Sequence, residues 1–427
     1  MEEEIEPTPA LIPTEEGPQR RKGPAFSTTF ASFRYRNYQL YFGGQLVSNV
    51  GTWMQIIAQG WLVYELTHSE LVLGIVGFAS AIPALLVTPW GGVVVDWVNK
   101  RSLLIITQLA AMILAFILAV LTFTDKVTVW QIVILAAFTG LVNAFDAPAR
   151  MAFIVDMVNR PDLPNAIALN SLMFNLARVL GPAIGGILLA AVGAAWCFTI
   201  NGISFLAVVV CLMAMHIVYQ RKPPSSDNPV QQLAAGVRYV RSQNTILALV
   251  LLTLVFSIFG VSYVTLLPAY VDKVLRAGPT WYGVVNAFTG LGAVTAALIL
   301  AQPTIQGRRG RILNLANMGF PLVLGAFAYV RIPILSLPLA FGLGVGFMMQ
   351  FALINTLLQT VVEDELRGRV MALYTLTFFG FAPFGNLIIG VAAEAYGLSV
   401  TILVSAVITL ILGRLIFWRV REIKKLP

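Results

Sequence analysis

Charged side chains are scarce in this sequence: Asp, Glu, Lys and Arg make up only 11% of the 427 residues, whereas 58% are hydrophobic. Soluble domains carry about 25% charged residues, so this composition excludes an ordinary soluble protein. The mean hydropathy of +0.81 indicates a chain that lies largely in a lipid bilayer.

The residue types and motifs that carry most enzyme chemistry are also few. Only two histidines occur, His68 and His216, both near the ends of apolar segments, and there is no H-E-x-x-H motif. The absence of G-x-x-x-x-G-K-[ST] excludes a P-loop ATPase. The two cysteines, Cys197 and Cys211, fall on one predicted helix about 21 Å of rise apart, so they cannot form a disulfide with each other. We therefore expect a protein that is not an enzyme and that uses neither a metal nor a cofactor.

Long apolar segments dominate what is present. A membrane-spanning helix needs about 20 apolar residues, and twelve segments reach that length. They are roughly 38–65, 71–95, 102–124, 128–150, 163–192, 194–218, 245–271, 280–303, 312–331, 333–360, 370–394 and 398–418. The sequence therefore predicts an all-α integral membrane protein with twelve transmembrane helices.

Positive charge is concentrated on one side of this predicted array. If the N-terminus is cytoplasmic, the cytoplasmic segments carry 21 Lys or Arg and the opposite side carries four, Lys126, Lys273, Arg276 and Arg331. This asymmetry predicts that both termini lie in the cytoplasm. It also explains the net charge of +8 without a nucleic-acid partner.

Polar segments divide the chain into parts. Residues 1–25 hold six acids and five prolines, which predicts a disordered cytoplasmic tail and not a signal peptide. In the middle of the chain, apolar residues recur at helical spacing from Val230 to Val240, beside Arg238 and Arg241, which predicts an amphipathic surface helix. The predicted parts are the tail 1–25, a six-helix half 26–218, a cytoplasmic linker 219–244, a six-helix half 245–420 and a basic tail 421–427.

The two halves resemble each other. Residues 166–186 align with 370–390 at an offset of 204, with identical residues at seven positions. A repeat of six spans predicts two halves related about the membrane normal. Arg178 aligns with Ala382, so the mid-membrane arginine belongs to the first half alone.

A charged turn, GGVVVDWVNKR at 91–101, joins the second and third spans. Asn99 can take the left-handed conformation that a tight turn between two helices needs. Asp96, Lys100 and Arg101 could hold helix ends together through charge pairs and release them again. We predict that Asp96 holds an outward-facing state by binding the start of the eleventh span or bases near it.

This turn resembles the motif G-x-x-x-D-[RK]-x-G-[RK]-[RK] of the major facilitator superfamily. Trp97 stands in place of the usual base and Asn99 in place of the usual glycine. A second basic turn, EDELRGRVM at 363–371, precedes the eleventh span. The residues predicted to form a conformational latch are Gly92, Asp96, Lys100, Arg101, Arg367 and Arg369.

Polar residues follow one face of the first span at steps of four, three, three and four. Lipid would penalise such a face, so it must meet protein or water. Two interpretations stay open, hydrogen bonding between helices and the wall of a substrate cavity. The candidate cavity residues of this span are Gln45, Asn49, Thr52, Gln55 and Gln59.

The fourth and fifth spans carry the candidate residues for proton coupling. Asp146 and Arg150 are spaced i, i+4 and can form a pair, either as a static tie or with Asp146 carrying a proton. Arg178 lies near mid-membrane and cannot lose its proton, so it needs amides, an acid, water or an anionic group of the substrate. We predict a proton switch in which Asp146 pairs with Arg178 in one state and separates from it in another.

Further positions complete the predicted site. Gly181, Pro182, Gly185 and Gly186 form G-P-A-I-G-G, which predicts a kink and a close approach by a neighbouring helix. Methionine and aromatic residues beside a few amides would suit a bulky, partly apolar solute. The remaining candidate cavity residues are Asn143, Asn175, Tyr263, Met349, Gln350, Asn355 and Phe378.

Four segments resemble one bacterial branch of the major facilitator superfamily, that of enterobactin-exporter and macrolide-efflux-like (transmembrane secretion effector) proteins. They are FRYRNYQLYFGGQLVSNVGTWMQ (33–55), FDAPARMAF (145–153), NAIALNS (165–171) with GPAIGG, and ELRGRVMALY (365–374). The resemblance implies export of a small drug- or siderophore-like molecule by alternating access, driven by proton antiport. A translocase for lysophospholipid or another lipid, and an importer, stay open as alternatives. We expect a functional monomer.

Overall fold

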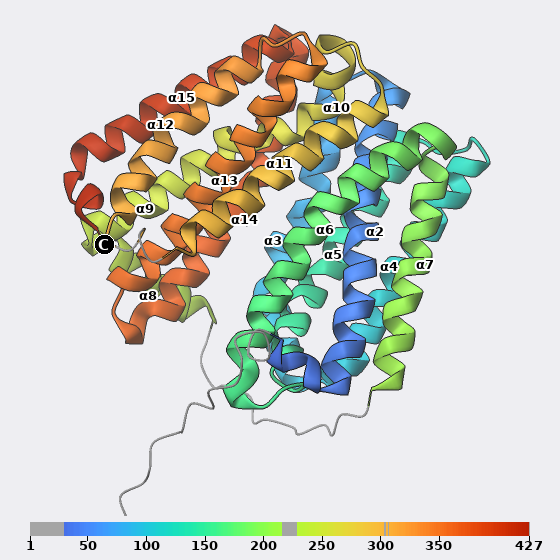
Figure 1. The fold of residues 1–427 in the computed structure, drawn as a ribbon, viewed down its shortest axis with the longest axis horizontal. Helices are drawn as coiled ribbons and strands as arrows, with labels where there is room; N and C mark the ends of the chain where they lie inside the picture. The colour runs from blue at the N-terminus through green and yellow to red at the C-terminus, as the bar shows by residue number, and fades with distance from the viewer. Residues whose placement is uncertain (1–29, 216–228, 303–304, 306, 427) are drawn as a thin grey trace, which may run out of the picture.

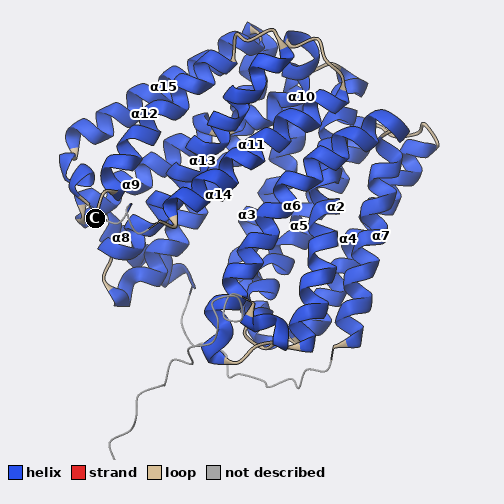
Figure 2. Cartoon of the chain, in the orientation of Figure 1, coloured by secondary structure: helices blue, strands red, loops and turns tan. Residues whose placement is uncertain are grey.

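The structure, a computed structural model, describes residues 30–215, 229–302, 305 and 307–426 (Figure 1). The predicted tail 1–25 and residues 219–228 of the predicted linker lie outside the described residues. All secondary structure in the described ranges is helical, which confirms the all-α prediction (Figure 2).

Six long helices form the first group, drawn blue to green in Figure 1. They follow the short 3-10 helix η1 (Ala31–Arg34) and are α2 (Arg36–Thr67), α3 (Glu70–Trp97), α4 (Lys100–Phe123), α5 (Val129–Ile154), α6 (Leu163–Val192) and α7 (Ala194–Ala214), with η2 (Arg160–Asp162) before α6. Within this group α3 packs on α5, α4 packs on α7, and α2 packs on both α6 and α7.

The second group follows a short helix, α8 (Pro229–Ser242), which covers most of the predicted linker helix. α8 packs on α14, where Gly236 lies against Arg369. The group's long helices are α9 (Asn244–Val255), α11 (Pro279–Leu300), α12 (Arg309–Phe327), α13 (Pro333–Val361), α14 (Asp364–Tyr396) and α15 (Leu398–Arg419), and η7 (Arg421–Lys425) follows them.

The seventh span is not one regular helix. After α9 the chain passes through η3 (Phe256–Gly260, a π-helix), η4 (Ser262–Leu266, 3-10), α10 (Leu267–Ala269) and η5 (Tyr270–Val274, a π-helix). Pro268 and Gly260 account for part of this irregular backbone path. Pro268 has no backbone N–H to donate, and a Cβ on Gly260 would lie 2.5 Å from the Phe256 ring. Such π-segments often mark functional sites.

Ten helices of the described chain are long and apolar enough to cross a membrane. α2 and α12 are the two further helices needed for the predicted twelve spans, with α9 to η5 counted as one span. α2 carries the row of amides, and α12 begins with Arg309 and Arg311, so their mean hydropathy is lower.

The charged turn between α3 and α4 differs from the prediction in one detail. Asn99 is not left-handed, because its φ is −66° and its ψ is 112°. Instead its side-chain oxygen accepts hydrogen bonds from the backbone N–H groups of Arg101 (3.0 Å) and Ser102 (3.3 Å), so Asn99 caps the start of α4. An N-cap needs extended backbone, which is why the predicted turn conformation is wrong.

The two groups converge at one end of the molecule, which is the top of Figure 1, and diverge toward the other. α3 packs on α14 and α6 packs on α11, so two helices of each group form the contact. The chain turns at 67–70, 192–194, 274–279 and 396–398 lie at the converging end, which we name the sealed end. The turns at 97–100, 154–163 and 361–364 lie at the other end, which we name the Asp96 end.

Candidate functional site

Glycines bring the backbones of the two groups together near the sealed end. A Cβ on Gly186 of α6 would lie 2.6 Å from the Cα of Gly283 of α11. A Cβ on Gly390 of α14 would lie 3.1 Å from the Cα of Gly74 of α3. Because only small residues allow such contact, the two groups fit against each other without intervening side chains at these points.

Charged side chains reinforce the sealed end. Lys273 Nζ is 2.7 Å from Glu70 Oε1, and Glu70 is only 4% exposed. The same ammonium donates to the carbonyl oxygen of His68 at 3.3 Å. Tyr64 Oη donates to Asp272 Oδ2 at 3.1 Å. Each contact joins the first group of helices to the second.

Glu394 near the end of α14 binds the start of α3. Its Oε2 accepts hydrogen bonds from Ser69 Oγ (2.8 Å) and from the backbone N–H groups of Glu70 (2.9 Å) and Leu71 (3.3 Å). A carboxylate is favourable at a helix N-terminus because the free N–H groups there carry partial positive charge. Glu70 and Glu394 were not predicted from the sequence as site residues, since each looks like an ordinary charge at a helix end.

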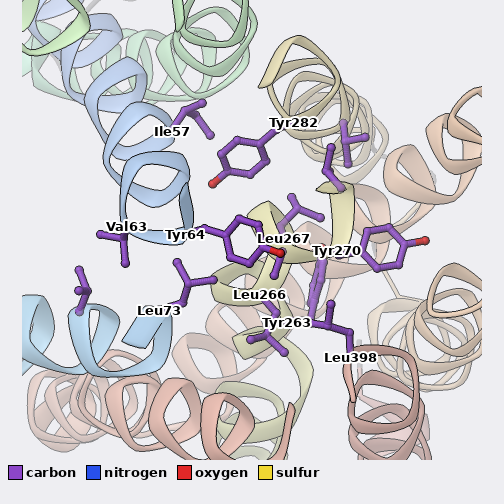
Figure 3. Close-up of a cluster of buried hydrophobic side chains, with 14 of the residues drawn as sticks. Ile57, Val63, Tyr64, Leu73, Tyr263, Leu266, Leu267, Tyr270, Tyr282 and Leu398 are labelled. Carbon is purple, nitrogen blue, oxygen red and sulfur yellow. The ribbon is translucent and has the colours of Figure 1, made fainter. Parts of the chain in front are cut away.

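A hydrophobic cluster lies beside these polar contacts and draws on both groups. Tyr64 and Leu73 belong to the first group, and Tyr263, Leu266 and Tyr270 belong to the second (Figure 3). The two sets of side chains are buried against each other, so the sealed end excludes water as well as pairing charges.

At the Asp96 end the predicted latch residues contact their own group. Lys100 Nζ is 2.6 Å from Asp156 Oδ2, and the Arg101 guanidinium donates to the carbonyls of Leu212 (2.7 Å) and Met213 (2.8 Å). Arg367 pairs with Asp364 on α14. Arg369 lies against α8, as described above. Gly92 and Asp96 fall in α3, but their side chains lie outside the described residues.

A buried polar network lies inside the first group. Asp146 is 2% exposed, and its Oδ2 is 2.7 Å from Arg150 Nε, the pair that the i, i+4 spacing indicates. Its Oδ1 accepts hydrogen bonds from Thr107 Oγ1 (2.8 Å) and Gln108 Nε2 (2.9 Å) of α4. One carboxylate therefore joins α4 to α5 and is fully bonded in this conformation.

The polar face of α2 binds neighbouring helices. Arg150 donates to Gln45 Oε1 (3.1 Å) and Asn49 Oδ1 (3.4 Å), and Asn201 of α7 donates to Gln55 Oε1 (2.6 Å). For these three amides the structure favours hydrogen bonding between helices over a cavity wall. The other two residues of this face are placed differently. Thr52 donates to the Ser48 carbonyl of its own helix, and Gln59 is half-buried.

Arg178 stands where helices of both groups meet. Its guanidinium carbon is 4.6 Å from the ring centroid of Phe347 on α13 and 5.8 Å from that of Trp53 on α2. Among the described residues, its guanidinium has no ion pair and no hydrogen-bond acceptor. Asp146 is occupied by Arg150, so the predicted Asp146–Arg178 pair is not formed in this conformation.

The other predicted cavity residues are scattered. Tyr263 and Phe378 are buried among aromatic rings, with Phe378 4.9 Å from Phe351. Gln350 is fully buried and accepts a hydrogen bond from Asn317 of α12 at 3.3 Å, so it lies inside the second group. The remaining positions are exposed or half-buried, namely Asn143, Asn175, Met349 and Asn355.

The glycines of G-P-A-I-G-G pack α6 on two different helices. A Cβ on Gly181 would lie 2.4 Å from the Trp53 Cβ, and one on Gly185 would lie 3.0 Å from the Met54 Cα, both on α2. Gly186 instead faces α11 of the other group. The motif therefore fixes α6 between its own group and the opposite one.

Residues 27–426 match the family of transmembrane secretion effectors of the major facilitator superfamily. The chain belongs to this family. The match spans both groups of helices, so it confirms the resemblance found in the sequence. Members are multi-pass membrane transporters, which supports a small-molecule substrate, and the bacterial relatives imply a plasma-membrane location.

Relatives of this secretion-effector chain transport different compounds. It is 26% identical over 388 residues to a staphyloferrin A transporter of Staphylococcus aureus, covering 90% of this chain and 96% of that protein. It is 26% identical to the multidrug efflux pump Tap of Mycobacterium tuberculosis, covering 90% of each. It is 23% identical to the enterobactin exporter EntS of Shigella boydii, covering 79% of this chain and 80% of that protein.

Solved structures support the fold. A peptide transporter, POT, aligns with a TM-score of 0.75 at 13% identity, covering 91% of this chain and 95% of that one. The nucleoside transporter NupG aligns with a TM-score of 0.72 at 12% identity, covering 90% and 98%. The predicted fold, twelve helices in two halves, is confirmed by these alignments.

Proposed function

We propose that this protein exports a small amphipathic molecule, drug- or siderophore-like, by alternating access coupled to inward proton flow. In this proposal both termini and the Asp96 end face the cytoplasm, as the positive-inside rule predicts. The sealed end then faces outward, and the structure represents an inward-facing state of a functional monomer. The transport of a siderophore and of drugs by relatives supports the substrate class.

The observation that carries the proposal is the position of the contacts between the two halves. The described hydrogen bonds and ion pairs that join them, from Glu70, Tyr64 and Glu394, lie at the sealed end. At the Asp96 end, Lys100, Arg101 and Arg367 bind within their own halves. One state of an alternating-access transporter requires this arrangement, in which the halves contact each other at one end and are separate at the other.

For proton coupling we propose Asp146 as the carrier, with Arg150 as its charge partner. The carboxylate is buried and bonded by three groups, Arg150, Thr107 and Gln108, so protonation would release Arg150 and the α2 amides that Arg150 binds. That release would loosen α2 and α4 against α5. Arg178 was predicted to share this role, but it does not contact Asp146 in this conformation.

The proposal can be tested with the purified full chain in proteoliposomes. We expect an imposed pH gradient to drive uphill movement of at least one amphipathic compound from a panel of a lipophilic dye, an iron-free siderophore and a lysophospholipid. Movement of the dye or siderophore toward the proton-rich side supports export. Movement of the lysophospholipid alone would favour a lipid translocase, and movement in the opposite direction an importer. If no compound moves under any gradient, the proposed function is wrong.

A further inference from the structure

Arg178 lies at the centre of the molecule in both depth and breadth. It is near the middle of α6, and Phe347 is at the midpoint of α13. Trp53 comes from α2, and Gly290 of α11 would place a Cβ 3.2 Å from the Arg178 carbonyl oxygen. Helices of both halves therefore surround one guanidinium at mid-membrane depth, where a solute passing between the halves must travel.

Within the described residues, no acidic side chain balances the charge of Arg178. The described ion pairs use other bases, and Asp146 of the same half is held by Arg150. Aromatic faces attract a cation but leave most of its five N–H donors without a strong acceptor. An arginine cannot become neutral at physiological pH, so this site retains a full positive charge in a weakly polar environment.

We propose that Arg178 binds an acid group of the substrate, so that the transported molecules are amphipathic organic anions. This inference rests on the proposed export function and specifies its substrate class. The planar guanidinium matches a carboxylate or a phosphate through two parallel hydrogen bonds. Either group satisfies the chemistry, so a small organic acid and a lysophospholipid phosphate are both possible sources.

The aromatic side chains beside Arg178 indicate the chemical nature of the rest of the ligand. Phe347 is parallel to Phe351 at a centroid distance of 6.1 Å, and Phe378 is 6.3 Å from Phe347. These rings form an apolar wall beside the guanidinium on the second half. The acid group would therefore be attached to an apolar or aromatic body that packs on this wall. Such a ligand contacts Arg178 of one half and the rings of the other, so it bridges the halves.

A binding experiment on matched acid and neutral compounds tests this assignment. The full chain, in nanodiscs of neutral lipid, is titrated with dansylglycine and with its uncharged amide, and with oleoyl lysophosphatidate and oleoylglycerol. We expect at least one acid to bind about tenfold or more tightly than its neutral counterpart, because hydrogen bonds to charged groups are the stronger class. Preference within the first pair indicates a free organic acid, and within the second pair a lipid. No acid preference in either pair would overturn the proposal.

Substitutions of Arg178 test whether this residue causes the preference for acids over neutral compounds. Arg178→Gln should reduce the acid's affinity to that of the neutral compound. Arg178→Lys should retain part of the preference, because the positive charge remains although the planar guanidinium and its two parallel hydrogen bonds are lost. The control is Arg414→Gln on α15, where the arginine already donates to Asn314 at 3.1 Å, and it should bind like the parent chain. An undiminished acid preference in Arg178→Gln would overturn the proposal. If that variant does not fold, Arg178→Lys and the acid-neutral comparison on the parent chain still decide.

Transport measurements distinguish the anion site at Arg178 from the proposed export function. If the parent chain moves a neutral or cationic dye against its gradient but shows no acid preference, export stands and the anion site is wrong. If acids bind in an Arg178-dependent way but no compound moves under a pH gradient, the site stands and the proposed function is wrong.

Discussion

Gly186 and Gly283 face each other across the boundary between the two halves with their backbones in contact. A Cβ on Gly186 would lie 2.6 Å from the Gly283 Cα, and a Cβ on Gly283 would lie 2.5 Å from the Gly186 Cα. No other pair of residues could occupy these positions without moving α6 away from α11. The sealed end therefore depends on the fit of two helix backbones as well as on charge pairs.

Gly186→Val should force the sealed end apart. Overpacking of this kind costs about 1–3 kcal/mol, and here the cost falls only on the sealed state. A cysteine at Leu73, which is 4% exposed on α3 and packs against the second half at the sealed end (Figure 3), should then react faster with a water-soluble maleimide, in a background where Cys197 and Cys211 are replaced by Ala. The control is Gly319→Val, because no atom lies within 4 Å of a Cβ at Gly319. Equal labelling rates in both variants would show that this glycine contact does not hold the seal.

Lys273→Met should also favour opening at the sealed end, for an electrostatic reason. It leaves the buried Glu70 carboxylate without its partner, which costs about 1–3 kcal/mol. Labelling of the same Leu73 cysteine should accelerate, and the added change Glu70→Gln should recover part of the loss because it removes the unpaired charge. Lys126→Met, at an exposed lysine of the same end, serves as the control. A double variant no slower than Lys273→Met would argue against direct coupling between these two residues.

Asp146→Asn should remove proton coupling while the protein remains folded. The amide keeps the shape of the carboxylate and can still accept from Thr107, but it cannot carry a proton or balance Arg150. We expect gradient-driven transport to be lost and exchange of substrate for substrate to continue. Asp156→Asn, which removes the more exposed pair with Lys100, should keep coupling and cost at most about 1 kcal/mol. A lower melting temperature with coupling intact would instead identify the Asp146–Arg150 pair as a static tie.

Arg101→Ala should destabilise the first half without changing the direction or the driving force of transport. Arg101 binds two carbonyls at the end of α7, where free carbonyls carry partial negative charge. Hydrogen bonds from a charged donor contribute about 1.5–3 kcal/mol, reduced here by partial exposure. We expect a lower melting temperature in detergent, partly recovered by Arg101→Lys, and no effect of Arg36→Ala at an exposed site. If Arg101→Ala melts like the parent chain but blocks transport, the predicted latch role would replace this structural one.

Features that depend on local pattern were predictable from the sequence. The apolar segments, the amphipathic helix that became α8 and the Asp146–Arg150 spacing all follow from hydropathy or from helical periodicity. The family followed from short motifs. Asn99 shows the limit of such reasoning, because an asparagine between helices suits both a left-handed turn and an N-cap, and only the orientation of the next helix decides between them.

The sealed end could not be predicted, because its contacts join distant positions. Lys273 lies 205 residues from His68, and Glu394 lies 325 residues from Ser69. Each of these charges sits at a helix end, where a solvated acid or base is the ordinary expectation. The irregular seventh span was also missed, since hydropathy does not distinguish an α-helix from a π-helix. The amides of α2 could not be assigned until the partners on α5 and α7 were placed.

Those amides also set the order in which the protein can assemble in its membrane. α2 precedes α7 in the chain and is less apolar than most of the described spans, and Gln55 gains its partner Asn201 only after 146 further residues. At about 5–20 residues per second, synthesis of that stretch takes roughly 7–30 s. During this interval α2 must remain beside the insertion machinery or in water. α2 therefore completes its hydrogen bonds only when α7 is in place, so a helix that precedes α7 in the chain settles no earlier than α7.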